Sequence, residues 1–241
     1  MKQALLDLMA SASPWALMGW ATVYFFAIYT LFASLAWALA RWLCRPIERR
    51  EVRPAQLTSE QRNSLRSIVL FGMGMVVPWG LLQLGWADIA GHATLPEIVL
   101  DGVLLVLWND LHFYGMHRLL HARFRKLHGL HHQSIAATPF AAYSMSAGEA
   151  LLLGSVMPMA MLVHDFSIES LALLPVWSIC INVLSHANCD LFPRARATSL
   201  LRFIRHHQHH HSHYHGNYGF LFIQLDQWFG TLQSIDKPGH S

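Results

Sequence analysis

The side chains with the clearest chemical potential are histidines, which are numerous and clustered. The chain has 241 residues and 17 histidines, and 13 of these fall in two windows, residues 112–132 and 206–215. Neutral imidazole is a borderline ligand that suits iron, zinc, copper and nickel. The two windows therefore predict a metal site built mainly from imidazoles.

The spacing inside the windows is that of ligands on helices. His117 and His121 are four residues apart, which places both rings on one helix face. Two HxxHH groups follow, at 128–132 and 207–211, and we expect the first and second histidines of each group to share a face. A further histidine follows Asn182 by four residues. The predicted ligands are His117, His121, His128, His131, His132, His186, His207, His210 and His211.

Nine imidazoles are too many for a single ion, because a zinc ion takes about four protein ligands in a structural site and three in a catalytic one. They are enough for two metals with positions left open for a small molecule. The chain lacks HExxH, the pattern that places a general-base glutamate between two zinc ligands. Of the remaining histidines, we expect His92, His164 and His240 to have no role in the site. Four others fall outside the repeated spacing, which disfavours a ligand role for them without excluding it: His112, His209, His213 and His215. His206 directly precedes the second HxxHH group.

The composition is that of a membrane protein. Hydrophobic residues make up 54% of the chain and charged residues 13%, against about 25% in soluble domains, and the mean hydropathy is +0.31. The net charge of +3 comes with no basic, aromatic-rich patch, so we expect no nucleic-acid partner. Three cysteines without CxxC spacing predict unpaired, unreactive thiols.

Apolar segments long enough to span a bilayer, which takes about 20 residues, position the histidines. Long runs occupy 15–40, 68–87 and 95 to about 117, and shorter runs occupy 151–163 and 171–183. We predict an all-α integral membrane protein with four to five membrane helices and a cytoplasmic helical cap that carries the di-metal site. Residues 1–94 form N-terminal membrane helices with a basic loop, and residues 95–241 form the catalytic domain.

The basic residues set the predicted orientation. Of 17 Lys and Arg, seven lie in residues 41–66, four in 118–126 and four in 194–205, all on one side if the helices alternate in direction. The positive-inside rule makes that side cytoplasmic. Both histidine windows open to the same side. The segment between the first two spans, residues 45–67, is expected to be a solvated loop.

The order of these motifs resembles the fatty acid hydroxylase/sterol desaturase superfamily of integral-membrane di-iron enzymes. The first histidine box is "DLHFYGMHRLLH", the second "LHGLHHQS", the third "HHQHHHSHYHGNYG", and "LDQWFGT" resembles the closing WDxxFGT. One departure concerns the HPxE motif that many members have after the second box. Here Ser146 and Ala147 replace its histidine and proline, and Glu149 is kept.

The resemblance implies O₂-dependent hydroxylation or desaturation of an unactivated C–H bond in a lipid, with two iron ions as cofactor. The chain has no Gly-rich dinucleotide motif and no haem-attachment CxxCH. Electrons from NAD(P)H are therefore expected through a separate reductase or electron-transfer protein. We expect a bacterial inner membrane rather than the endoplasmic reticulum as the location.

Four polar side chains near the boxes are predicted to orient the ligands, because groups outside the ligand shell commonly do so. They are Asp110, Glu149, Asn182 and Asp226. Two other functions stay open. A zinc-dependent membrane hydrolase needs a general-base carboxylate beside the metal and no reductant. A non-enzymatic metal-handling protein needs ligands that continue through the spans.

Overall fold

The structure, a computed structural model, describes residues 11–235. Over this range the chain is helical, with two isolated β-bridges and no β-strand. The predicted all-α class is confirmed. Short 3₁₀ turns join the helices around the histidines: η1 (His131–Gln133), η2 (Pro139–Tyr143) and η3 (Leu200–Arg202).

Four helical units are long and apolar enough to cross a membrane. They are α2 (Pro14–Leu43), α3 (Pro54–Gly74) with α4 (Val76–Gln83), α5 (Leu95–Arg123) and α9 (Ile168–Ser185). The run at 151–163 lies in α7 (Ala147–Gly154) and α8 (Val156–Met161). At 1.5 Å per residue these two together reach about 22 Å, short of the roughly 30 Å apolar core of a bilayer. The described residues thus contain four candidate spans.

One candidate span and the shorter apolar pair α7–α8 are each interrupted shortly before a proline. The break between α3 and α4 is at Met75, three residues before Pro78, and the break between α7 and α8 is at Ser155, three before Pro158. A proline lacks the backbone N–H and its ring clashes with the carbonyl four residues earlier, which favours a break at these two positions. α9 nevertheless continues through Pro175.

The solvated loop expected before the second span is wrong over its second half, because α3 begins at Pro54. One face of this helix end is polar and buried against the segment that follows the second histidine box. Ser64 Oγ donates to the Phe140 carbonyl at 2.6 Å, and Thr138 Oγ1 donates to Glu60 Oε2 at 2.5 Å. Buried polar groups need such partners, and a lone sequence segment does not show where its partners are.

The expectation of three unpaired thiols is also wrong. Cys44, at the end of α2, is disulfide-bonded to Cys189, 145 residues later, and Cys180 alone among the three is free. The backbone around the bond is paired as well, since Ile47 N donates to the Asn188 carbonyl at 3.3 Å. Cysteine count and spacing carry no information about such a distant contact.

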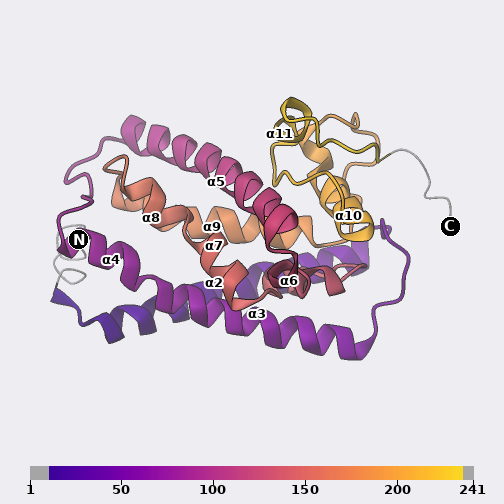
Figure 1. Cartoon of the computed structure of the whole chain (residues 1–241), viewed down its shortest axis with the longest axis horizontal. Coiled ribbons are helices and arrows are strands. Elements are labelled where there is room, and N and C mark those ends of the chain that lie inside the picture. Colours follow the sequence, from indigo (N-terminus) through magenta and orange to yellow (C-terminus); the bar gives the residue numbers. More distant parts are fainter. Residues whose placement is uncertain (1–10, 236–241) are drawn as a thin grey trace.

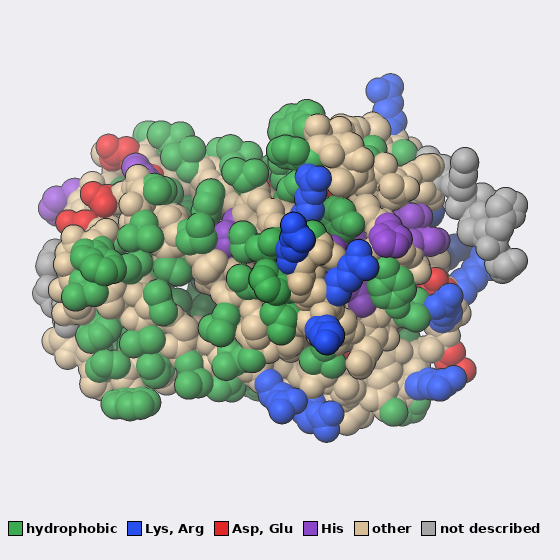
Figure 2. Space-filling view, in the orientation of Figure 1, with side chains coloured by type: hydrophobic (Ala, Val, Ile, Leu, Met, Phe, Trp, Pro, Cys, Tyr) green, Lys and Arg blue, Asp and Glu red, His purple; other side chains and the backbone are tan. Residues whose placement is uncertain are grey.

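The helices lie roughly along the long axis of the molecule, with α2 against α3 and α9, and α5 against α8 and α9 (Figure 1). α6 (Arg125–His128), α10 (Phe203–His213) and α11 (Gln224–Trp228) gather around the C-terminal end of α5, in the half of the molecule that holds this end (Figure 1). On the face in Figure 2, hydrophobic side chains cover the opposite half, and Lys and Arg gather toward the end that holds α6 and α10. The histidine-bearing elements therefore form a basic cap on an apolar bundle.

Candidate metal centre

The structure brings all nine predicted ligands together at this cap, in two clusters. The ring nitrogens of each cluster lie within 4.8 Å of one another. The five-histidine cluster is His117, His121, His128, His132 and His210, and the four-histidine cluster is His131, His186, His207 and His211. All but His121 are buried. The clusters adjoin, since the ring centroids of His132 and His211 are 4.9 Å apart.

Each HxxHH group divides its histidines between the clusters. His128 and His132 enter the five-histidine cluster, while His131 between them enters the other. The third box does the reverse, with His207 and His211 in the four-histidine cluster. The first and second members of each group, which were expected to share a face, therefore enter different clusters. Along α10 residues i and i+4 share a face, and the second box is not one helix, because α6 ends at 128 and η1 starts at 131.

Hydrogen bonds at Nδ1 fix how five of the rings are presented. His117 donates to the Tyr218 carbonyl at 2.9 Å, and His210 to the Gly216 carbonyl at 2.8 Å. The Nδ1 atoms of three other rings also donate. His186 donates to the Asn182 carbonyl at 2.7 Å, His211 to the Ser134 carbonyl at 3.1 Å and His128 to Glu149 Oε1 at 2.7 Å. A neutral ring that donates from Nδ1 carries a lone pair on Nε2, and it is Nε2 that faces the cluster.

The Nε2 atoms lie closer together than such lone pairs tolerate without a cation. In the five-histidine cluster the Nε2 atoms of His117 and His128 are 3.1 Å apart, although both rings donate through Nδ1. In the other cluster the same holds for His186 and His211, also at 3.1 Å. Two acceptors facing each other repel unless a positive charge lies between them. The donor set in each cluster fits a metal ion.

Protonation does not supply that charge, because burial keeps the rings neutral. Burial lowers the pKa of His186 to about 4. Burial, and then the neighbouring imidazoles, lowers the pKa of His211 and His128 far below the usual value near 6.5. Neutral imidazole is the form that binds metals.

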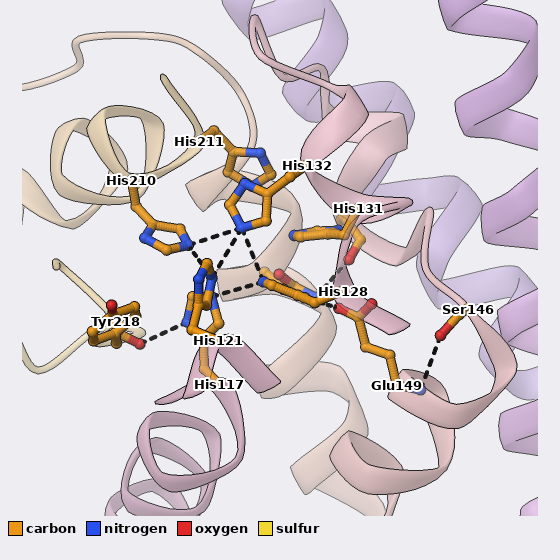
Figure 3. A network of polar contacts seen from close by, with 12 residues as sticks. His117, His121, His128, His131, His132, Ser146, Glu149, His210, His211 and Tyr218 are labelled. Atoms are coloured by element: carbon orange, nitrogen blue, oxygen red, sulfur yellow. Dashed lines mark hydrogen bonds and ion pairs between the residues drawn. The ribbon is translucent and has the colours of Figure 1, made fainter. Parts of the chain in front are cut away.

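Glu149 is the predicted polar residue in direct side-chain contact with a cluster. It contacts His128 from the side away from His117, His121 and His210, and Tyr218 lies on another side of the cluster, against His117 (Figure 3). Ser146, which replaces the histidine of the HPxE motif, caps α7 by accepting from Glu149 N at 3.2 Å. The carboxylate therefore keeps its place with serine as the helix cap.

The two predicted aspartates hold backbone rather than histidines. Asp226 accepts from the backbone N–H groups of Tyr218 at 2.8 Å and Gly219 at 2.7 Å. Asp110 accepts from Leu221 N at 2.9 Å and from Phe222 N at 2.5 Å. Together they fix the segment after the third box, whose Tyr218 carbonyl accepts from His117.

Asn182 serves the site through its main chain, because its carbonyl accepts from His186 Nδ1 while its side chain donates to the Ala142 carbonyl at 3.0 Å. Backbone carbonyls such as those of Ser134, Gly216 and Tyr218 were not predictable, since a carbonyl is common to every residue. The other described histidines stay outside both clusters. His209 and His213, for example, stack on each other at 4.0 Å on α10.

Two kinds of cavity flank the clusters. A cavity of about 650 Å³ reaches the five-histidine cluster from the basic cap; its lining includes His121, His128, His132, Arg118, Arg125 and Tyr218. On the bundle side, an apolar cavity of about 220 Å³ ends at Phe113, Asn182 and Phe220. Phe113 separates it from the metal-binding rings, with centroids 5.1 Å from His117 and 6.5 Å from His207.

The comparisons with known proteins agree with this site. The family model for fatty acid hydroxylase matches residues 102–231, a little over half of the chain, and this range includes all nine clustered histidines and the carboxylates Asp110, Glu149 and Asp226. This chain belongs to the fatty acid hydroxylase family. The resemblance drawn from the histidine boxes is confirmed.

Its relatives in the fatty acid hydroxylase family are distant. The chain is 25% identical over 219 residues to Delta(7)-sterol 5(6)-desaturase erg3C of Aspergillus fumigatus, and the match covers 74% of this chain and 63% of that protein. It is 26% identical over 184 residues to the Delta(7)-sterol 5(6)-desaturase erg31 of Schizosaccharomyces pombe (69% and 56%). It is 28% identical over 160 residues to Protein CER1-like 2 of Arabidopsis thaliana (59% and 26%). The chain thus spans less than two thirds of these relatives, and no solved structure matches it.

Proposed function

We propose that this protein is a membrane-bound, O₂-dependent di-iron enzyme that hydroxylates or desaturates an unactivated C–H bond of a lipid. The observation that carries the proposal is the pair of Nε2–Nε2 contacts at 3.1 Å, one in each cluster, between rings whose Nδ1 protons are already donated. Two such contacts support two metal ions. The family and its sterol desaturase relatives support lipid oxidation as the chemistry.

Iron bound there would supply redox chemistry with O₂, which zinc lacks because it does not change oxidation state. The residues of the chain would hold and orient the ligands. Backbone carbonyls and Glu149 fix the ring tautomers, and such outer hydrogen bonds keep ligand rings oriented. Nine imidazoles add no negative charge, so the metal pair would stay strongly cationic.

The two cavities support separate routes to the metals for the lipid and for the electron donor. The lipid would enter the apolar cavity from the bundle and reach the metals at the wall made by Phe113, Phe220 and Asn182. The larger cavity opens at the basic cap, where Arg118 and Arg125 line it. Charge complementarity there favours an acidic electron-transfer protein or reductase as the separate donor of electrons from NAD(P)H.

We also propose that the basic cap faces the cytoplasm. The Lys and Arg clusters lie at the histidine end of the four candidate spans, as the positive-inside rule requires. A bacterial inner membrane is our proposed location, and residues 95–241 our proposed catalytic domain.

A zinc hydrolase is the competing function, because four imidazoles also suit zinc. Metal analysis separates the two. Protein purified without a histidine tag from iron-supplemented cells should hold about two irons per chain, with the Mössbauer spectrum of a coupled pair. A single tightly held zinc ion, with no iron taken up anaerobically, would exclude the oxygenase.

Single substitutions on α10 make the test specific to each cluster. His210→Ala removes a ligand from the five-histidine cluster and His211→Ala one from the four-histidine cluster, whereas His213→Ala removes a ring outside both. Each of the first two variants should lose iron, and His213→Ala should keep the wild-type content. Equal iron in all three would contradict the assignment of the clusters.

A further inference from the structure

The apolar cavity in the bundle is lined in part by a small group of polar side chains that the metal site does not use. It is lined by Asn109 and His112 of α5 and by Ser155 at the break between α7 and α8. α5 packs against both α7 and α8 (Figure 1). Polar groups at membrane depth are costly and usually serve a function.

Asn109 has an unused donor there. Its side chain is 3% exposed, and Nδ2 has no hydrogen-bond partner in the described part of the chain. A buried donor without a partner costs about 1–3 kcal/mol. Because Asn109 lines the cavity, this donor is available to a molecule that enters it.

His112 complements Asn109. Its Nε2 lies 2.9 Å from Ser155 Oγ, whose own proton goes to the Leu152 carbonyl at 2.7 Å. Nε2 is therefore the donor in that contact, and Nδ1 of the neutral ring remains an acceptor. Asn109 and His112 are three residues apart, so their side chains are neighbours on one helix face. Together they offer one donor and one acceptor to the cavity.

A hydroxyl group matches this pair, because it accepts one hydrogen bond and donates another. Most of the rest of the lining is apolar, with Tyr143, Ser178 and Asn182 as its other polar side chains, and the cavity adjoins a second one of about 450 Å³. The two share five lining residues, Phe25, Met75, Pro78, Met157 and Pro175. The two adjoining cavities together suit a mostly hydrocarbon molecule that carries a polar group.

We propose that Asn109 and His112 select a hydroxyl-bearing lipid and hold its hydroxyl away from the metals. At 1.5 Å per residue, they lie about 12 Å and about 8 Å along α5 from His117. The hydroxyl is thus remote from the carbon presented to the clusters. This inference rests on the proposed function, since it treats the cavity as the place of the lipid substrate.

The test is a binding measurement that does not need turnover. The full-length protein in nanodiscs is given two matched probe pairs, cholesterol with cholestane and hexadecan-1-ol with hexadecane, and bound probe is counted by native mass spectrometry. The wild type should prefer the alcohol in at least one pair by about tenfold, the size of one well-made hydrogen bond. Asn109→Leu and His112→Phe should each reduce that preference severalfold.

Met157→Leu is the matched control, because it changes the lining of the same cavity without touching a polar group. It should keep the preference. No preference in the wild type, or an undiminished preference in both Asn109→Leu and His112→Phe, would overturn the proposal. Iron content measured on the same samples separates the two ideas: an iron-free protein that prefers alcohols contradicts the proposed function alone, and an iron-loaded protein without preference contradicts this inference alone.

Discussion

Glu149 Oε1 accepts a hydrogen bond from His128 Nδ1 at 2.7 Å, and both side chains are buried. The second oxygen, Oε2, has no partner in the described chain. The carboxylate therefore acts on one ligand of the five-histidine cluster and holds its Nε2 toward the other rings. It is the one feature of the HPxE motif that this chain keeps.

Replacing Glu149 should weaken metal binding at the five-histidine cluster. Glu149→Gln keeps a side-chain oxygen that can accept from His128, and Glu149→Ala removes it. Loss of such an outer partner commonly costs 10–100-fold in metal affinity or activity. We expect Glu149→Ala to lose iron to a chelator faster than Glu149→Gln, and both faster than wild type. Wild-type iron retention in Glu149→Ala would contradict the assigned role.

Acid should destabilise the protein and release its metal. The seven cluster histidines outside α5 all have lowered pKa values because they are buried: His128, His131, His132, His186, His207, His210 and His211. In the unfolded chain they titrate near pH 6.5. Below that pH the unfolded state binds protons that the folded state excludes, so stability falls as the pH falls.

The pH range of this loss of stability follows from the pKa values of the histidines in the unfolded and folded states. The loss should begin near pH 6.5 and continue toward pH 4, the pKa of folded His186. Thermal unfolding and bound iron, both measured in steps from pH 8 to pH 4.5, should decline together in this range. A melting temperature that stays constant down to pH 5 would show that the rings are not buried as neutral groups.

Gly72 is a point of close helix contact. A Cβ atom placed there would come within 2.6 Å of Thr22 Cα, which is backbone of α2 and cannot turn aside. Small residues allow such approach between membrane helices. Gly72→Ala should therefore destabilise the protein by about 1–3 kcal/mol. Gly74→Ala is the control, since its Cβ would meet nothing within 4 Å. Equal melting temperatures for the two variants would contradict this packing of α2 on α3.

The Cys44–Cys189 bond tests the proposed orientation, because both cysteines belong to the basic cap end. Cytoplasmic thiols are kept reduced. If the cap is cytoplasmic, rapid alkylation of growing cells should find both cysteines as thiols, and the bond should form when the purified protein is oxidised. Cys180, free in the structure, is the internal control for alkylation. A bond already complete in cells would place the cap on the opposite side of the membrane.

The sequence pattern of consecutive residues was enough to predict the spans, the family and the clustered histidines. Apolar length predicted the four candidate spans, and the ordered boxes predicted the family. The nine histidines that the structure brings together are those chosen from spacing. These features are predictable because span length and helical periodicity are properties of consecutive residues, and a bilayer or a metal imposes them locally.

The tertiary structure decided how the nine are divided and what holds them. His131 and His132 are adjacent in sequence, yet they enter different clusters, because the chain turns between α6 and η1. His117 meets the Tyr218 carbonyl across 101 residues, and Cys44 meets Cys189 across 145. The two aspartates hold the backbone after the third box instead of histidines. Contacts at such separations depend on which helices pack together, and side-chain type alone does not encode the position of a backbone carbonyl.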